Sequence, residues 1–227
     1  LQERVVAEGA DFGVAFDGDA DRCFIIDENG TTISGDLAAA LIAKNVLEKE
    51  PGATILYSAV CSKAFPELVE REGGKAIRTR AGHSIIKPQM RKHDAAFGGE
   101  HSAHFYFRDN YFADSGIIAM LTIAELVGRQ EEPISRLLSP IDPYVRSGEI
   151  NSEVRDQKAT LGKVEDHFSK HNDAKVDDLD GLTVDLGDWW FNLRPSNTEP
   201  LLRLNVEAED NETMERKRDE LLKLIRG

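Results

Sequence analysis

Three aspartates lie at alternate positions of one short segment, Asp17, Asp19 and Asp21, and Arg22 follows directly. A glycine and an alanine separate them, and small residues allow the backbone to curl until the carboxylates converge. Carboxylate oxygens arranged in this way suit a hard cation such as Mg²⁺. The spacing therefore predicts a magnesium site in a loop between two apolar strands.

Three other interpretations of this acidic loop stay open. An EF-hand that starts at Asp17 would place Glu28 at its twelfth position, but Arg22 occupies the sixth, where the turn needs glycine. A phosphatase with an aspartate nucleophile would use Asp17 and Asp19, although such loops usually continue with small hydroxyl or apolar residues. A solvated acidic turn is the third interpretation, and the apolar runs on both sides disfavour it.

A second polar segment, residues 97–104, follows an expected strand, and α/β proteins bind ligands at the carboxyl ends of strands. Glu100 offers an acceptor and Ser102 a donor for the hydroxyl groups of a sugar. His101 and His104 lack the spacing of a zinc site, which favours ordinary polar or substrate-contacting histidines. The segment is a candidate sugar site, with a polar hairpin as the alternative.

A third segment, residues 194–200, lies between two expected strands near the end of the chain. Arg194 can hold a phosphate with two parallel hydrogen bonds. Ser196, Asn197 and Thr198 add donors in a turn that can form an anion-binding nest. A turn stabilised by the same side chains is the alternative interpretation.

The composition limits the partners. With 28 basic and 41 acidic residues the net charge is −13, which disfavours nucleic acid and anionic membranes as partners. A local site such as residues 194–200 is then needed to hold an anionic substrate. No apolar run approaches the roughly 18 residues of a membrane span. The two cysteines, Cys23 and Cys61, are expected to be packed thiols of a reducing compartment. We expect a cytoplasmic protein.

Strands and helices alternate along the first part of the chain, as in a mixed, mostly parallel sheet covered by helices. The strands are expected at residues 12–16, 23–26, 54–59, 75–79 and 95–97, with a hairpin near 104–112. The helices are expected at residues 37–49, 63–72, 84–92 and 115–128. Asp36 is expected to cap the first of these helices.

Prolines concentrate between residues 131 and 143, which indicates a domain boundary. Beyond it we expect a smaller α+β domain with a mostly antiparallel sheet. Its strands are expected at residues 144–151, 182–186, 189–194 and 201–208, and its helices at 157–170 and 211–226.

In this order, Asp-Gly-Asp-Ala-Asp-Arg (17–22), Gly-Gly-Glu-His-Ser (98–102) and Arg-Pro-Ser-Asn-Thr-Glu-Pro (194–200) resemble the α-D-phosphohexomutase superfamily. The bacterial phosphomannomutase/phosphoglucomutase branch is the most similar, and residues 79–84 and 185–190 extend the resemblance over nearly the whole chain. The resemblance implies a Mg²⁺-dependent, four-domain isomerase that interconverts mannose or glucose 1- and 6-phosphates through a bisphosphorylated sugar. A phosphoserine in the first domain would donate the phosphoryl group.

The resemblance also implies roles for individual residues. The expected Mg²⁺ ligands are Asp17, Asp19 and Asp21. Arg22 would lie beside the transferring phosphoryl group and His83 at the centre of the cleft, as catalytic residues. Glu100 and Ser102 would hold the sugar hydroxyls. The residues expected to hold the non-reacting phosphate are Arg194, Ser196, Asn197 and Thr198.

The chain departs from the family pattern in two ways. A Ser-His-Asn-Pro type motif, which would carry the phosphoserine, is absent, and Val60 stands where some relatives place a catalytic lysine. Lys63 is nearby, and the general acid/base stays unassigned.

These departures predict a C-terminal portion that is inactive alone and depends on missing N-terminal domains of the same protein. Residues 1–30 would end the second domain and carry the metal loop. Residues 31–142 would form the sugar-binding third domain and residues 143–227 the phosphate-binding fourth domain. A non-catalytic sugar-phosphate-binding module is the alternative.

Overall fold

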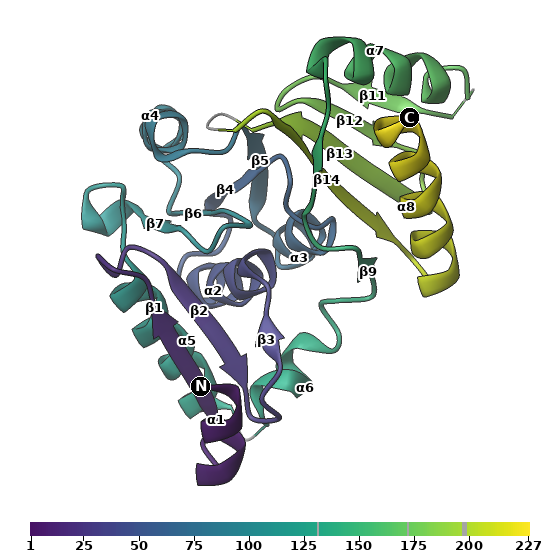
Figure 1. Ribbon diagram of the computed structural model, residues 1–227. Helices are drawn as coiled ribbons and strands as arrows, with labels where there is room; N and C mark the ends of the chain where they lie inside the picture. The colour runs from purple at the N-terminus through teal and green to yellow at the C-terminus, as the bar shows by residue number, and fades with distance from the viewer. Residues whose placement is uncertain (131, 172, 197–198) are drawn as a thin grey trace. The chain divides into compact units, whose positions relative to one another are not determined.

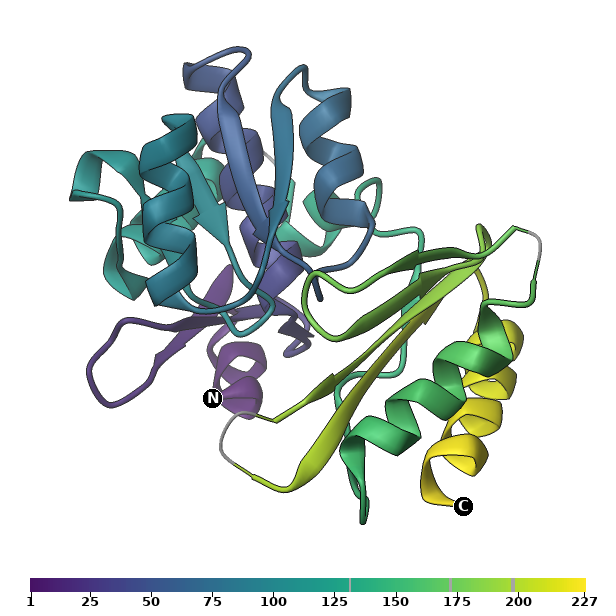
Figure 2. The same cartoon turned by 90° about the horizontal axis from the view of Figure 1, so that it is seen from above.

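The chain divides into two compact units, residues 1–143 and residues 144–227 (Figure 1). Both units combine helices with sheets (Figure 2). The residues that the computed structural model describes are 1–130, 132–171, 173–196 and 199–227. None of the helices within these ranges is long and apolar enough to cross a membrane.

The first unit begins with a helix and a small antiparallel sheet. Helix α1 (Gln2–Glu8) precedes β1 (Phe12–Phe16), β2 (Cys23–Asp27) and β3 (Thr32–Ile33), which pair in chain order. The strands expected at 12–16 and 23–26 are confirmed, and the acidic loop joins them. It closes a hairpin in which Phe16 pairs with Cys23.

The larger sheet of the first unit has five strands in the order β5-β4-β6-β7-β8. They are β4 (Thr54–Ser58), β5 (Lys75–Thr79), β6 (Phe97–Gly99), β7 (Phe105–Phe107) and β8 (Ala113–Asp114). Strand β4 is parallel to β5 and β6, whereas β7 is antiparallel to both of its neighbours. The sheet is mixed, as expected. The expected hairpin becomes two, with the short helix η1 (Arg108–Asn110) between β7 and β8.

Among the described residues of the first unit five further α-helices follow, and four of them were expected. They are α2 (Gly35–Lys49), α3 (Ala64–Arg71), α4 (His83–His93), α5 (Gly116–Arg129) and α6 (Ile134–Leu138). The short helix α6 lies in the proline-rich stretch and was not expected. The N-cap prediction for Asp36 is wrong, because Ser34 occupies the N-cap position of α2 and Asp36 lies inside the helix. The buried Asp36 carboxylate instead accepts a hydrogen bond from the Ser62 backbone amide at 2.8 Å.

Strand β6 lies two residues further along the chain than expected, and its glycines explain why. A Cβ on Gly99 would lie 2.5 Å from Ala39 Cβ of α2 and 3.0 Å from Phe65 of α3. A Cβ on Gly98 would meet Met90 of α4 at 3.0 Å. Because neighbouring strand residues point to opposite faces, helices approach β6 closely from both sides. The two glycines therefore belong to the strand, and the polar turn starts at Glu100.

The second unit is an antiparallel sheet packed against two helices. The strand order is β10-β14-β13-β12-β11, and β9 also pairs with β14. The strands are β9 (Val145–Arg146), β10 (Ile150–Glu153), β11 (Lys175–Asp177), β12 (Leu182–Asp185), β13 (Trp189–Pro195) and β14 (Leu201–Ala208). The helices are α7 (Gln157–Phe168) and α8 (Asn211–Arg226). The antiparallel α+β domain is as expected. Two short strands replace the one expected at 144–151, because Gly148 turns the chain at φ +68°.

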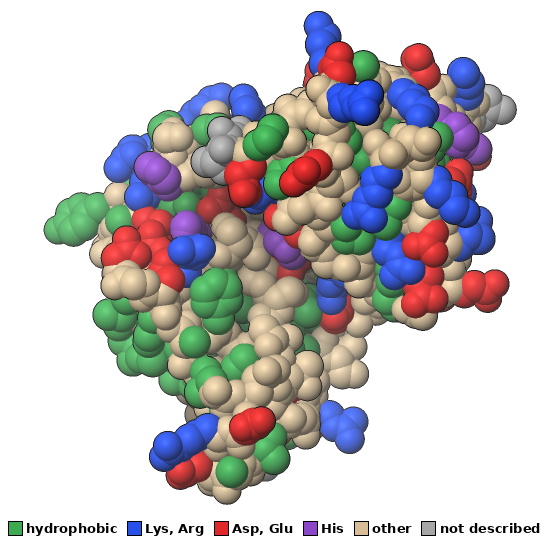
Figure 3. All heavy atoms as spheres, in the orientation of Figure 1, with side chains coloured by type: hydrophobic (Ala, Val, Ile, Leu, Met, Phe, Trp, Pro, Cys, Tyr) green, Lys and Arg blue, Asp and Glu red, His purple; other side chains and the backbone are tan. Residues whose placement is uncertain are grey.

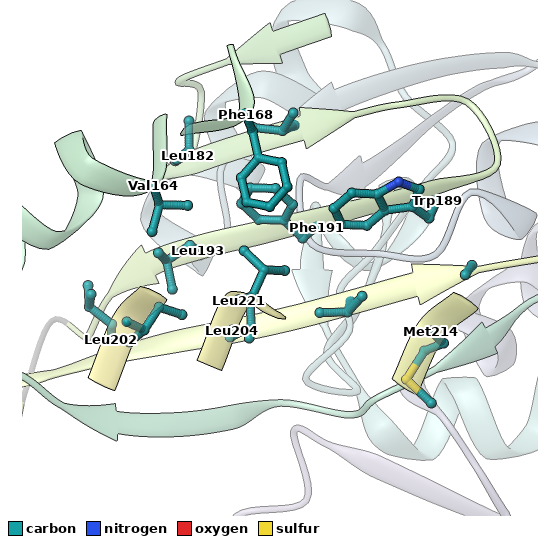
Figure 4. Packing of buried hydrophobic residues seen from close by; sticks show 14 residues of the cluster. Val164, Phe168, Leu182, Trp189, Phe191, Leu193, Leu202, Leu204, Met214 and Leu221 are labelled. Atoms are coloured by element: carbon teal, nitrogen blue, oxygen red, sulfur yellow. The ribbon is translucent and has the colours of Figure 1, made fainter. Parts of the chain in front are cut away.

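Buried side chains from α7, α8 and the central strands form the core of this unit (Figure 4). Phe168 lies at its centre, with its ring centroid 5.5 Å from that of Trp189 and 5.1 Å from that of Phe191. In the first unit, Cys23 and Cys61 are buried free thiols, as expected. Burial raises the pKa of Cys23 to about 12, which keeps it in the unreactive thiol form.

Replacing Phe168 by alanine removes the ring that joins α7 to the sheet. We expect Phe168→Ala to lower the free energy of unfolding of the second unit by about 3–5 kcal/mol. Both tryptophans of the chain, Trp189 and Trp190, lie in this unit, so fluorescence during urea denaturation follows its unfolding. Lys170→Ala, at an exposed position, is the control and should change the value by less than about 0.5 kcal/mol. Equal midpoints in the two variants would contradict this description of the core.

Candidate functional site

The acidic loop is held in place by backbone contacts with two other elements. Ala20 adopts a left-handed conformation at φ +60°, and its carbonyl accepts a hydrogen bond from the Gly116 amide at 3.1 Å. Arg22 forms a β-bridge with His104, and the Cys23 amide donates to the Ala103 carbonyl at 3.3 Å. The start of α5 and the turn after β6 therefore fix the position of the loop.

The three aspartates of the loop come together as their spacing predicts. Asp17, Asp19 and Asp21 each offer a carboxylate oxygen, and these atoms lie within 4.8 Å of one another. Asp19 is exposed, and the other two are partly buried. Figure 3 shows acidic side chains gathered over the tip of the β1–β2 hairpin. Convergent carboxylate oxygens are the ligands that Mg²⁺ prefers, so the residues present fit this ion.

Arg22 is the counter-charge of the loop. Its Nε donates to Asp17 Oδ2 at 2.7 Å, and its backbone amide donates to Asp17 Oδ1 at 3.2 Å. Burial raises the pKa of the Asp17 carboxyl, but these hydrogen bonds and the charge of Arg22 outweigh burial and lower it below its ordinary value. Burial raises the pKa of Asp21, and the neighbouring aspartates add to the rise. A bound cation would offset this repulsion.

The turn of residues 100–104 brings the candidate sugar residues beside the loop. The Ala103 amide donates to the Glu100 carbonyl at 3.1 Å, and the Glu100 amide donates to the His104 carbonyl at 3.1 Å. The start of α2 packs tightly on this turn, since a Cβ on Gly35 would lie 2.4 Å from the His101 carbonyl oxygen. Ser102 lies exposed in the turn, with its hydroxyl 3.5 Å from Glu100 Oε2.

Glu100 is buried and already has protein partners. Its Oε1 accepts a hydrogen bond from the Gly82 amide at 2.5 Å, and its Oε2 accepts one from the Tyr106 hydroxyl at 3.1 Å. Gly82 directly precedes His83, the first residue of α4. Glu100 therefore links the turn of residues 100–104 to the start of α4, where His83 lies.

His104 lies between the acidic loop and the turn of residues 100–104, a placement that its sequence position did not reveal. Its Nε2 lies 3.7 Å from Asp21 Oδ1, and its Nδ1 lies 3.6 Å from Glu100 Oε2. Asp21, His104 and Asp114 also form a second group of possible metal ligands. Only the i,i+4 separation of Glu100 and His104, closed by the turn, could have indicated this placement.

The EF-hand interpretation does not fit the structure. Glu28, which would be its last ligand, is engaged elsewhere: its carboxylate accepts hydrogen bonds from the hydroxyl and the backbone amide of Ser135. The segments on both sides of the loop are strands, whereas an EF-hand loop is flanked by helices.

In the second unit, the candidate phosphate residues lie at the end of a strand pair. Arg194 of β13 is the register partner of Arg203 of β14, and Ser196 follows β13. Arg203 Nη2 donates to the Ser196 hydroxyl at 3.3 Å. Glu149 forms ion pairs with both arginines, each at 3.2 Å. Arg203 and Glu149 were not expected at this site, because only strand pairing brings them to Arg194.

The site residues thus form one group in each unit. The first group is Asp17, Asp19, Asp21, Arg22, Glu100, Ser102 and His104, with His83 linked through Gly82. The second group contains Arg194 and Ser196. Asn197 and Thr198 lie outside the described residues.

Comparisons with known proteins match both units. The family model described as phosphoglucomutase/phosphomannomutase, alpha/beta/alpha domain III, matches residues 34–144. The model described as phosphoglucomutase/phosphomannomutase, C-terminal domain, matches residues 149–224. A phosphomannomutase of Methanocaldococcus jannaschii is 44% identical over 221 residues, which cover 97% of this chain and 49% of the relative. The chain therefore spans about half the length of the curated relatives it matches.

Two solved structures share the fold. A phosphoglucomutase/phosphomannomutase family protein from Burkholderia thailandensis has a TM-score of 0.85 and 31% identity, over 98% of this chain and 48% of the other. An N-acetylphosphoglucosamine mutase of Aspergillus fumigatus, solved with GlcNAc-6P and magnesium, has a TM-score of 0.70 and 15% identity, over 94% of this chain and 52% of the other.

Gly116 provides a test of how the acidic loop is held. A Cβ at this position would lie 2.7 Å from the Arg22 carbonyl oxygen and 2.8 Å from that of Ala20, so the loop would have to move. We expect Gly116→Ala to weaken Mg²⁺ binding, followed by NMR titration, at least about tenfold, and to destabilise the first unit by about 1–3 kcal/mol.

Gly128 in the same helix is the matched control, because nothing lies within 4 Å of a Cβ built there. Gly128→Ala should leave Mg²⁺ binding unchanged and stabilise α5 by about 0.5–1 kcal/mol. If the two alanine variants bind Mg²⁺ equally well, the start of α5 does not hold the loop.

Proposed function

Because the chain belongs to the phosphoglucomutase/phosphomannomutase family, we propose that it is the C-terminal portion of a Mg²⁺-dependent phosphomannomutase/phosphoglucomutase. The whole protein would interconvert hexose 1-phosphate and hexose 6-phosphate through a bisphosphorylated intermediate. The observation that carries this proposal is the link through His104 between a three-carboxylate loop and the Glu100 turn. A metal site and a sugar-binding turn that are a few ångströms apart suit phosphoryl transfer to a sugar hydroxyl.

The protein would be divided as the sequence predicts. Residues 1–30 would be the end of a second domain, residues 31–142 the third and residues 143–227 the fourth. The domains that precede them would supply the phosphoserine. The family matches to residues 34–144 and 149–224 support this division. The partners would be mannose or glucose phosphates and the N-terminal domains of the same protein, in the cytoplasm, with no part for nucleic acid or membrane.

Asp17, Asp19 and Asp21 would hold Mg²⁺, as their convergence within 4.8 Å supports. The structure of the Aspergillus relative contains magnesium, and this finding is consistent with Mg²⁺ as the ion. When bound, the ion would neutralise charge on the phosphoryl group that is transferred. Arg22 already lies against Asp17, so its guanidinium is placed to add a second positive charge beside that group.

The sugar would bind at the turn of residues 100–104. The exposed Ser102 hydroxyl can donate to or accept from a sugar hydroxyl, and Glu100 orders the turn and the start of α4. His83 would line the same cleft. We assign the open acid/base role to His104, since its imidazole lies between a metal-loop carboxylate and a sugar-turn carboxylate.

The non-reacting phosphate would bind to Arg194 and Ser196, together with Asn197 and Thr198. Strand pairing holds Arg194 beside Arg203, so two guanidinium groups are available to a phosphate at this loop. Contacts to a phosphate distant from the reaction would orient the sugar and supply binding energy for the transition state.

The proposal predicts that activity requires both the preceding domains and the acidic loop. The 227-residue chain alone should not isomerise mannose 1-phosphate, because it lacks the phosphoserine. The protein extended by its N-terminal half should do so with Mg²⁺, followed by ³¹P NMR. Asp19→Asn in the extended protein should lower kcat by about 10²–10³, because the metal loses a ligand.

Asp11→Asn is the control, since Asp11 is exposed and precedes β1 outside the loop. It should leave kcat unchanged. Isomerisation by the 227-residue chain alone would overturn the assignment of the phosphoryl donor to the preceding half. An extended protein that binds hexose phosphates without converting them would favour the non-catalytic module.

A further inference from the structure

At the candidate phosphate site, the carboxylate of Glu149 lies between Arg194 of β13 and Arg203 of β14. Glu149 Oε2 is 3.2 Å from Arg194 Nη2, and Glu149 Oε1 is 3.2 Å from Arg203 Nη1. The three side chains are 26%, 18% and 27% exposed, in that order. A carboxylate bridging two guanidinium groups makes the contacts that an oxyanion ligand would make.

The arginines keep hydrogen-bonding capacity beyond this bridge. Arg203 Nη2 donates to the Ser196 hydroxyl, but the Nε atoms of Arg194 and Arg203 are buried and have no acceptor among the described residues. A guanidinium offers five N–H donors, and Glu149 accepts from one nitrogen of each arginine. A ligand with more oxygens than a carboxylate can therefore make more hydrogen bonds here than Glu149 does.

The charges around the loop nearly cancel. Arg194 and Arg203 carry two positive charges, and Glu149 carries one negative charge between them. Glu199 adds a weaker contribution, since it is 3.8 Å from Arg203 and 60% exposed. An incoming monoanion would only replace the charge that Glu149 already supplies. A dianion would add a charge and at least one acceptor oxygen.

We propose that Glu149 is a resident competitor at the candidate phosphate site formed by Arg194, Arg203 and Ser196. Every anion must displace the Glu149 carboxylate from the arginine pair, which weakens the binding of all anions by the same factor. A dianionic phosphate, with more charge and more acceptor oxygens, still binds, whereas monoanions such as chloride or a carboxylate become too weak to occupy the site. This inference rests on the proposed function, which assigns Arg194 and Ser196 to phosphate binding. Displacing Glu149 is feasible because partly exposed ion pairs contribute little to stability. Because monoanions are abundant in a cell, competition by Glu149 keeps the site available to sugar phosphates.

The test compares a dianion and a monoanion, sulfate and formate, by NMR titration of the 227-residue chain. In the unmodified chain sulfate should bind at least about tenfold more tightly than formate. Glu149→Gln keeps the shape of the side chain and removes its charge. It should tighten the binding of both anions about three- to tenfold and leave the ratio of the two dissociation constants nearly unchanged. Tryptophan fluorescence during denaturation checks that the variant folds.

Glu199→Gln is the matched control, because it removes the same charge from a more exposed neighbour. It should change both dissociation constants by less than about twofold. Unchanged dissociation constants in Glu149→Gln, or weaker binding of both anions, would overturn the competitor role, and the weaker binding would show that Glu149 only positions the arginines.

Arg194→Ala separates a failure of this inference from a failure of the proposed function. As the single substitution in the 227-residue chain, it should abolish sulfate binding. If sulfate binding survives this substitution, the anion binds elsewhere and the phosphate site itself is wrong. If Arg194→Ala abolishes binding while Glu149→Gln leaves both dissociation constants unchanged, only the role of Glu149 is wrong.

Discussion

Three carboxylates that converge within 4.8 Å repel one another, and the first unit is organised to keep them together. Arg22 supplies the opposing charge inside the loop. The backbone of Gly116 and the bridge to His104 hold the loop from outside. Because these anchors belong to α5 and to the turn after β6, they place the carboxylates beside Glu100 without requiring a ligand. The position of the carboxylates relative to Glu100 thus depends on how these anchors restrain the acidic loop.

The candidate phosphate site also pairs opposite charges, but there the single charge is negative and the set of like charges is positive. In the first unit an arginine lies against a set of carboxylates, and in the second a glutamate lies between two arginines. Each candidate site contains a side chain of the opposite charge, which lowers the repulsion between its like charges. A protein of net charge −13 can in this way present a local cation pair without binding anions indiscriminately.

The features that the sequence predicts well are those with local causes. The alternate spacing of Asp17, Asp19 and Asp21 is enough to predict convergence, because a tight loop brings such positions together. Apolar runs likewise predict most strands and helices to within a few residues. The shift of β6 was missed because it comes from Ala39 and Phe65, which pack on Gly99 from distant parts of the chain. His104 and Glu149 were missed for the same reason, since only the turn and the strand register bring them to their partners.

The hydrogen bond from the Gly116 amide to the Ala20 carbonyl joins residues on the two sides of a domain boundary in the family models. The acidic loop lies before residue 34, where the match to the third domain begins, yet its anchor lies inside that match. Recombination that exchanged only residues 34–144 between relatives would pair a loop from one parent with a helix start from the other. Because a single added methyl group at Gly116 would strike the loop backbone, a helix start from another relative can hold this loop only if it keeps the glycine. The structural unit that forms this site is therefore larger than the domain that carries most of its residues.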